Sequence, residues 1–232
     1  MSPFQQKQLT LIRQMELAFQ TNSSASQTVS MQKDYTNDNQ LCLAAVSFLP
    51  TDLATIIDTQ LIKPLQLLNP DQYYFPINGL HLTVQNVRVI ASPPSYDNDT
   101  IERAKTVFST IVPHYGAQHF ELAGLLNMPT SLAVIALVTK EFNQLVRQLR
   151  SELILNDCAD NKSYYNDEII FANITICRYT KIPDKKWFDF IEKIKNKPIG
   201  NFNAKTISLI ETNAGCHPSK TTIFDTYKFR QN

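Results

Sequence analysis

The chain has 232 residues, of which 22 are Lys or Arg and 21 are Asp or Glu, so its formal charge at pH 7 is +1. This balance excludes a protein whose whole surface binds nucleic acid through its charge. A hydrophobic content of 43% with 19% charged residues also excludes a disordered chain, a collagen and a long coiled coil. At this length we expect one compact body built from two related halves.

The scarce residues exclude further classes of protein. The five glycines lie too far apart to form a G-x-G-x-x-G loop or a P-loop. No C-x-x-C pair occurs, so we expect buried thiols and no zinc site at Cys42, Cys158, Cys177 and Cys216. The N-terminus lacks an apolar signal region, and the longest apolar stretch, 132–138, is shorter than the roughly 20 residues that span a bilayer. We therefore expect a cytoplasmic protein of a reducing compartment that makes no membrane contact.

The first 40 residues look like an addition to the main body. Loosely periodic apolar residues predict a helix over 3–20, and the polar composition of 21–40 predicts a long loop or linker. We interpret this linker as a tether, the alternative being a loop that folds over a ligand. The predicted organisation is thus an N-terminal helix and polar linker (1–40), followed by one domain (41–232).

Strands and helices alternate along the rest of the chain. The predicted strands are 41–49, 80–90, 120–126, 131–138, 169–179, 204–211 and 221–229. Helices are predicted over 50–68, over 99–112 behind a capping box of Asp99 and Glu102, after the N-cap Thr139, and around Trp187. The core face of the third is predicted to be Phe142, Leu145, Val146, Leu149 and Leu153. The order strand, helix, strand, strand occurs in each half, which predicts a pseudo-duplicated α+β body with an antiparallel-rich sheet in each lobe.

Two of the predicted strands carry matching polar positions. Because side chains alternate along a strand, His81 and Thr83 share one face of the first strand, and Asn173 and Thr175 share one face of the second. The next positions predicted on these polar faces are Gln85 and Cys177. The opposite, core-facing positions are Leu80, Leu82, Val84, Ile170, Ala172, Ile174 and Ile176.

A His-x-Thr/Ser-x tetrapeptide in a strand, repeated in the second half of a duplicated α+β chain, resembles the two-histidine (2H) phosphoesterase superfamily. This superfamily includes 2'-5' RNA ligase-like proteins and cyclic phosphodiesterases. The element order from Leu41 to the C-terminus is similar as well. The resemblance implies a bilobal fold with helices in each lobe and both motif strands lining a cleft between the lobes. It also implies one histidine as general base, the other as general acid, and hydroxyl groups that hold phosphate oxygens, without a metal or other cofactor.

The second motif departs from this pattern, because Asn173 replaces its histidine. A carboxamide forms hydrogen bonds but does not transfer protons at pH 7. The predicted site therefore consists of His81 as the surviving acid or base, with Thr83, Thr175 and Asn173 as phosphate ligands. Since a positioned acid or base contributes about 10²- to 10⁴-fold, we expect slow or absent turnover with binding retained. The alternatives are a non-catalytic nucleotide or RNA sensor with the same cleft, and an accidental motif.

Three further features of the sequence bear on the ligand, which we expect to be a nucleotide or the terminal phosphate of RNA. Arg178 closely follows Thr175 and is expected to contact an anion, and Tyr179, or Tyr164 and Tyr165, could stack on a base. The segment 178–205 is rich in basic residues, which we interpret as a solvated face, with attraction of RNA as the alternative. His217 is a minor candidate for the missing proton donor. The sequence carries no DNA-specific signal.

Overall fold

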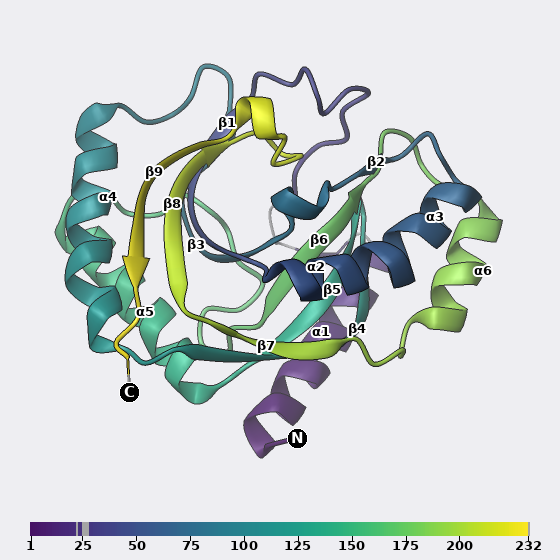
Figure 1. The fold of residues 1–232 in the computed structure, drawn as a ribbon, viewed down its shortest axis with the longest axis horizontal. Helices are drawn as coiled ribbons and strands as arrows, with labels where there is room; N and C mark the ends of the chain where they lie inside the picture. The colour runs from purple at the N-terminus through teal and green to yellow at the C-terminus, as the bar shows by residue number, and fades with distance from the viewer. Residues whose placement is uncertain (22, 25–27, 232) are drawn as a thin grey trace.

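The computed structural model describes residues 1–21, 23–24 and 28–231, which form two antiparallel sheets flanked by helices (Figure 1). The four-stranded sheet has the order β3-β1-β8-β9, with β1 (Leu41–Phe48), β3 (His81–Ala91), β8 (Thr206–Thr212) and β9 (Thr222–Lys228). The five-stranded sheet has the order β2-β6-β5-β4-β7, with β2 (Tyr73–Tyr74), β4 (Gln118–Met128), β5 (Ser131–Val138), β6 (Ala172–Arg178) and β7 (Gly200–Ala204). The predicted α+β class, with an antiparallel sheet in each lobe, is confirmed.

Helices cover both sheets. They are α1 (Pro3–Gln20), α2 (Thr51–Ile57), α3 (Lys63–Leu68), α4 (Asn98–Ile111), α5 (Lys140–Leu155) and α6 (Lys185–Ile194). Helices α4 and α5 lie beside the four-stranded sheet, where Phe108 of α4 stacks on Tyr227 of β9. Helices α3 and α6 meet the five-stranded sheet at Tyr74, whose hydroxyl donates to the Leu65 carbonyl and whose ring lies 6.3 Å from that of Trp187. No helix of the described chain is both long and apolar enough to cross a membrane.

Most predicted elements are present, and the differences have local causes. The helix predicted over 50–68 contains a π turn, Asp58–Ile62, because Pro64 lacks the N–H that a regular helix needs at this point. The predicted capping box at Asp99 is wrong, since Asp97 accepts the hydrogen bond from the Thr100 N–H at 2.9 Å. Strands β2 and β7 were not predicted because β2 has two residues and only two of the five residues of β7 are buried.

Strand β3 contains a β-bulge directly after its motif threonine. Consecutive residues of β1 pair with Thr83 and Gln85, so Val84 has no partner across the ladder. One unpaired residue moves the side chains that follow it to the opposite face of the strand, up to the next irregularity of the ladder, where Val87 is unpaired. The prediction that Gln85 shares a face with His81 is therefore wrong, because Gln85 is buried and Asn86 lines the cavity described below.

Strand β6 contains a bulge at the corresponding place. Consecutive residues of β5 pair with Thr175 and Cys177, which leaves Ile176 unpaired. Cys177 is consequently buried in the core, as expected for its thiol but not on the face predicted with Thr175, and Arg178 takes the cavity-facing position. The two motif strands thus share a backbone irregularity as well as a sequence pattern.

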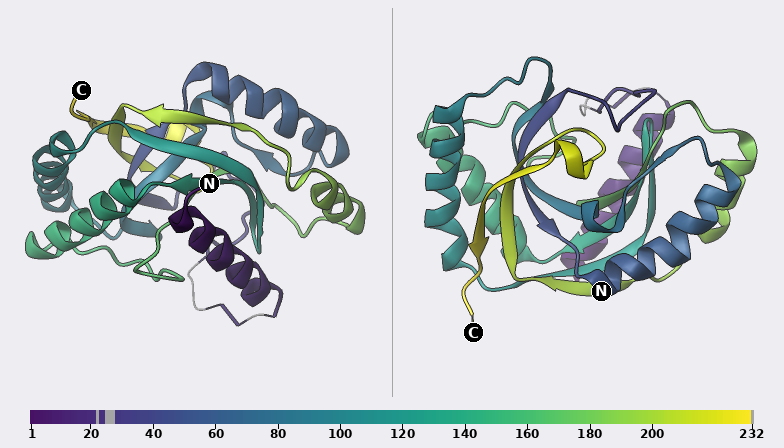
Figure 2. Two further views of the ribbon diagram at one scale, coloured as in Figure 1. Left: turned by 90° about the horizontal axis from the view of Figure 1, so that it is seen from below. Right: turned by 45° about the horizontal axis from the view of Figure 1, so that its top comes forward.

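The N-terminal helix packs on the face of the five-stranded sheet opposite α2 and α3 (Figure 2, left). Its residues Ile12 and Met15 contact Ile135 in a small apolar cluster. The buried Gln8 side chain donates to the carbonyl of Val138 at 3.1 Å and accepts from its N–H at 3.0 Å. Helix α1 is therefore an integral layer of the molecule.

The segment after α1 also packs against the body. The Thr130 hydroxyl donates to the Val29 carbonyl at 2.7 Å. Tyr35 is 1% exposed, and its hydroxyl donates to the carbonyl of Tyr179 while its own carbonyl accepts from the Asn213 amide. Residues 28–40 contain no helix or strand, and these contacts favour a loop that packs on the body over a tether. Residues 22 and 25–27 of the predicted linker lie outside the described residues.

Candidate functional site

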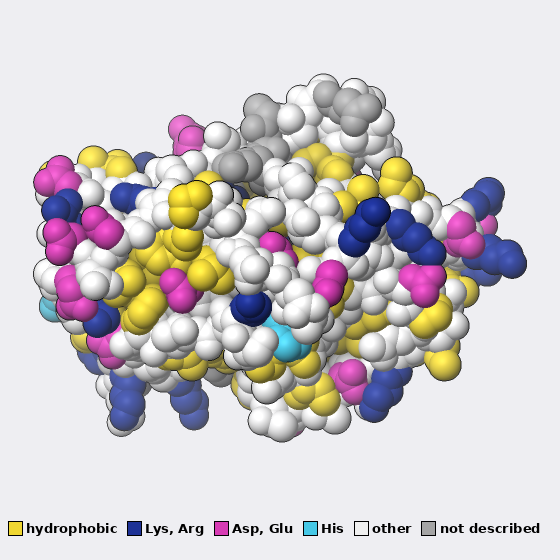
Figure 3. Space-filling model, turned by 90° about the horizontal axis from the view of Figure 1, so that it is seen from above, with side chains coloured by type: hydrophobic (Ala, Val, Ile, Leu, Met, Phe, Trp, Pro, Cys, Tyr) yellow, Lys and Arg dark blue, Asp and Glu magenta, His cyan; other side chains and the backbone are white. Residues whose placement is uncertain are grey.

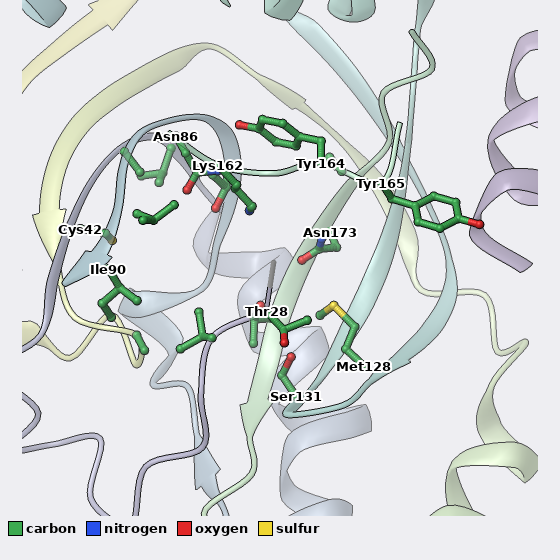
Figure 4. Close-up of a pocket in the computed structure, with 18 of the residues that line it drawn as sticks. Thr28, Cys42, Asn86, Ile90, Met128, Ser131, Lys162, Tyr164, Tyr165 and Asn173 are labelled. Atoms are coloured by element: carbon green, nitrogen blue, oxygen red, sulfur yellow. The ribbon is translucent and has the colours of Figure 1, made fainter. Parts of the chain in front are cut away.

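Strands β3 and β6 lie against one another and contribute to a single cavity of about 290 Å³ (Figure 4). This volume is close to the lower end of the range of small-molecule pockets. The structure brings five of the six predicted site residues together in its wall: His81, Thr83, Asn173, Thr175 and Arg178. Helix α1, residues 28–29 and the loop 162–171 complete the enclosure.

The two motifs run in opposite directions along the cavity. At one end, the Arg178 Nε donates to the Ala214 carbonyl at 3.1 Å, and His81 is hydrogen-bonded to Cys216 in the same loop. The other end holds Asn86, Asn173 and Lys162 (Figure 4). The cavity therefore has a histidine at one end and an asparagine at the other.

His81 is oriented by the backbone of Gly79 and by two aromatic rings. Its Nδ1 donates to the carbonyl of Gly79 at 2.8 Å, and the rings of Phe48 and Phe75 lie 6.2 Å from the imidazole. Because Nδ1 carries the proton in this hydrogen bond, Nε2 is the ring nitrogen without a proton, and Cys216 is a further side-chain hydrogen-bond partner of the imidazole. The Gly79 carbonyl and the two aromatic neighbours thus fix the orientation of the imidazole at the cavity wall.

Cys216 contributes to a raised pKa of His81, and this contact was not predicted from the sequence. Burial alone would lower the pKa of His81, but the charge and hydrogen bond of Cys216, together with the Gly79 carbonyl, raise it above 6.5. The reciprocal effect lowers the pKa of the Cys216 thiol below 9.0, even though burial opposes this. No sequence pattern indicated this pair, because it depends on a loop after β8 that folds back over the start of β3.

We expect the Cys216→Ala substitution to lower the pKa of His81, because burial of the imidazole then acts without the opposing thiol. The measurement is an NMR titration of the histidine ring protons. His119 on β4, which is hydrogen-bonded to Asn203 on β7 and lies outside the cavity, serves as the internal reference. A His81 titration curve that stays in place or moves to higher pH would contradict the assigned influence of Cys216.

The side chains that the motifs predict to bind phosphate have no hydrogen-bond partner within the described protein. Within the described chain, the hydroxyls of Thr83 and Thr175 and the carboxamide of Asn173 make no hydrogen bond to other protein groups. Asn173 lies at the wall of the cavity below Tyr164 in the view of Figure 4. Partly buried polar groups without protein partners are suited to accept or donate hydrogen bonds to a bound anion.

The charged groups of the cavity wall are all cationic. Arg178, Arg150 and Lys162 line it, and among the described residues no Asp or Glu does. Burial lowers the pKa of Arg178, whose guanidinium has no carboxylate within 4 Å in the described structure. Arg150 lies 3.8 Å above the Tyr164 ring and is bonded to Asp167 outside the cavity. Such a wall favours an anionic ligand. The described residues hold no cluster of three or more His, Cys, Asp or Glu side chains that could bind a metal ion.

Two of the predicted candidates lie outside the cavity. Tyr179 is 1% exposed, and its hydroxyl donates to Asn127 at 2.6 Å and accepts from the Trp187 indole. His217 is bonded to Ser219 in its own loop. Neither lines the cavity, whereas Tyr164 and Tyr165 do.

The basic segment 178–205 behaves mainly as a solvated face. Lys181 pairs with Asp71, Lys185 with Asp189, and Lys195 with Glu16 and Glu192. The face of the molecule seen from above in Figure 3 likewise shows acidic and basic side chains interspersed. From this segment, Arg178 reaches the cavity.

Comparison with known proteins shows a likeness in structure. No family model and no curated protein matches the sequence. A crystal structure of a phosphoesterase covers 83% of this chain and 100% of its own, with a TM-score of 0.58 and 12% identity. The structure of TT0787 of Thermus thermophilus covers 82% and 99%, with a TM-score of 0.60 and 14% identity. Escherichia coli LigT complexed with phosphate covers 84% and 100%, with a TM-score of 0.52 and 14% identity.

These neighbours match nearly their whole length to this chain, with identities of 12% and 14%. Likeness at this level demonstrates a common fold. The chain therefore has the bilobal fold of the phosphoesterase and LigT structures, the fold that the resemblance to the 2H phosphoesterases predicted.

Proposed function

We propose that this protein is a phosphodiesterase of the 2H type that binds the phosphate of nucleotides or RNA ends and slowly hydrolyses 2',3'-cyclic phosphates. The observation that carries the proposal is the cavity wall, where an oriented imidazole, unpartnered threonine hydroxyls and a buried guanidinium converge without any carboxylate among the described residues. Solved structures of LigT with phosphate, ATP and 3'-AMP add support through the shared fold.

The chemistry follows from the positions of these groups. The Nε2 of His81 takes a proton from a water molecule that attacks phosphorus, and the bond from phosphorus to a ribose oxygen breaks on the opposite side. Thr83, Thr175 and Asn173 donate hydrogen bonds to the non-bridging oxygens, and Arg178 balances their charge. Buried, preorganised donors stabilise the developing charge more strongly than water does.

The second candidate function is a nucleotide or RNA sensor without turnover. Asn173 favours it, because this side chain cannot replace the acid that the second motif of a 2H phosphoesterase supplies. The two functions differ in one observable, since a sensor binds the cyclic nucleotide and leaves it intact.

Arg178→Gln is expected to weaken binding of 2',3'-cyclic AMP about 10- to 100-fold, because hydrogen bonds to charged groups contribute about 1.5–3 kcal/mol. Isothermal titration calorimetry measures the affinity, and liquid chromatography of the same mixtures, without added metal, detects hydrolysis. Lys186→Gln, an exposed position on α6, is the matched control and should bind like the parent. Equal affinity of the parent for adenosine and for 2',3'-cyclic AMP would refute phosphate recognition.

A further inference from the structure

Lys162 is a cation of the cavity wall that the two motifs do not explain. Within the described chain its ammonium has no carboxylate within 4 Å and makes no hydrogen bond, and it lies 5.4 Å from the centre of the Tyr164 ring. The backbone around it is fixed, because the Lys162 N–H donates to Asp160 at 2.6 Å and the neighbouring Asn161 accepts from the Val89 N–H at 2.8 Å. The loop is therefore anchored to β3 while the ammonium remains available to a ligand.

The position of Lys162 within the cavity matters most. Lys162 lies at the end that also holds Asn86 and Asn173 (Figure 4). His81 lies at the other end, beside residues 214–216. In-line displacement at phosphorus needs proton transfers on opposite sides. Among the described residues of the cavity wall, Lys162 is the titratable cation at the end away from His81.

We propose that Lys162 is the general acid of the reaction and protonates the leaving ribose oxygen, the step that Asn173 cannot perform. This inference rests on the proposed function. Water adds its oxygen to phosphorus and gives one proton to His81, while the bond from phosphorus to the ribose oxygen breaks and that oxygen receives a proton from the ammonium. The products are a phosphomonoester and a ribose hydroxyl, and the imidazolium and the neutral amine then exchange protons with solvent.

The surroundings of Lys162 suit this role. Burial lowers its pKa below 10.5, and the charges of Arg178 on β6 and Arg150 on α5 act in the same direction. Asp160 on its own loop and Cys42 on β1 oppose the shift without reversing it. The Asp160 carboxylate accepts hydrogen bonds from Gln85 and from the Tyr164 hydroxyl, and it forms no ion pair with the Lys162 ammonium in the described structure. A lowered pKa makes the ammonium a better proton donor near neutral pH.

The test uses Lys162→Arg, which keeps the positive charge but does not release its proton in this pH range. We expect kcat for 2',3'-cyclic AMP to fall by about 10²- to 10⁴-fold while Kd changes by less than about threefold. The parent's kcat should also fall at alkaline pH as the ammonium titrates, and this limb should be absent from the residual activity of Lys162→Arg. Lys162→Met should lose the same turnover and also bind more weakly, and Lys186→Met should match the parent.

The outcomes distinguish a general-acid role of Lys162 from a purely electrostatic role. Full turnover by Lys162→Arg, with its alkaline limb unchanged, would overturn the proposal and leave Lys162 as an electrostatic contact. A parent that binds 2',3'-cyclic AMP without hydrolysing it would also overturn the proposal and favour the sensor. A parent that binds no phosphate ligand would instead refute the proposed function itself.

Discussion

The His81→Ala substitution is expected to lower kcat for 2',3'-cyclic AMP by about 10²- to 10⁴-fold, because it removes the positioned base. Binding should be retained, since the threonine hydroxyls and Arg178 remain in place. Steady-state hydrolysis and calorimetry on the same preparation measure both quantities. His217→Ala is the matched control, because this ring lies outside the cavity. Unchanged turnover in His81→Ala would remove the imidazole from the mechanism.

The pH dependence of the parent's activity is a second test of His81 as the general base. As a base, His81 must be neutral, and its pKa is raised above 6.5 by Cys216 and the Gly79 carbonyl against the effect of burial. Activity should therefore fall as the pH decreases through a value above 6.5. This acid limb should be absent from any residual activity of His81→Ala.

Asn173→His, introduced into the Lys162→Met protein, is expected to raise kcat at least about 10-fold, because an imidazole there supplies the missing acid. The change is compatible with the fold, since Asn173 lines the cavity and its carboxamide has no protein partner among the described residues. The gain in kcat from Asn173→His should be smaller in the parent, because Lys162 already acts there as the general acid. Comparing kcat of the parent, both single variants and the double variant measures this non-additivity.

Equal gains in both backgrounds would show that the two positions act independently, contrary to a shared proton transfer. No gain in either would place residue 173 too far from the leaving oxygen. Asn173→Gln is the control for a larger, non-titrating side chain at the same position.

Periodic sequence features predicted most of the secondary structure and the shared face of each motif pair. The alternation around His81 and Asn173 predicted which residues share a face, and the resemblance to the 2H phosphoesterases predicted that both motif strands line one cleft. Both motif pairs lie in the wall of one cavity, and the N-cap Thr139 and the buried face of α5 are confirmed. These signals are local, because the strand period and the capping hydrogen bond involve neighbours in the chain.

The remaining site groups depend on long-range packing. Lys162 and Tyr164 belong to an aperiodic loop that hydrogen bonds attach to β3. Cys216 approaches His81 only after β8 has joined the four-stranded sheet. Helix α1 closes the cavity with Met15 and Phe19, although its sequence looked like an addition. None of these contacts leaves a trace in the spacing of residues along the chain.

The paired bulges impose a constraint on how the two motifs can vary. Because Val84 and Ile176 are unpaired, the side chain that faces the ligand comes three residues after each threonine, as Asn86 and Arg178. Deleting or inserting one residue between either threonine and this position would move its side chain to the core face of the strand and would bring a core side chain to the cavity. Substitution at Asn86 or Arg178 keeps the face of the strand and changes the side chain presented to the cavity. The bulges therefore fix the number of residues between each threonine and the next cavity-facing position, whatever the identity of the residue at that position.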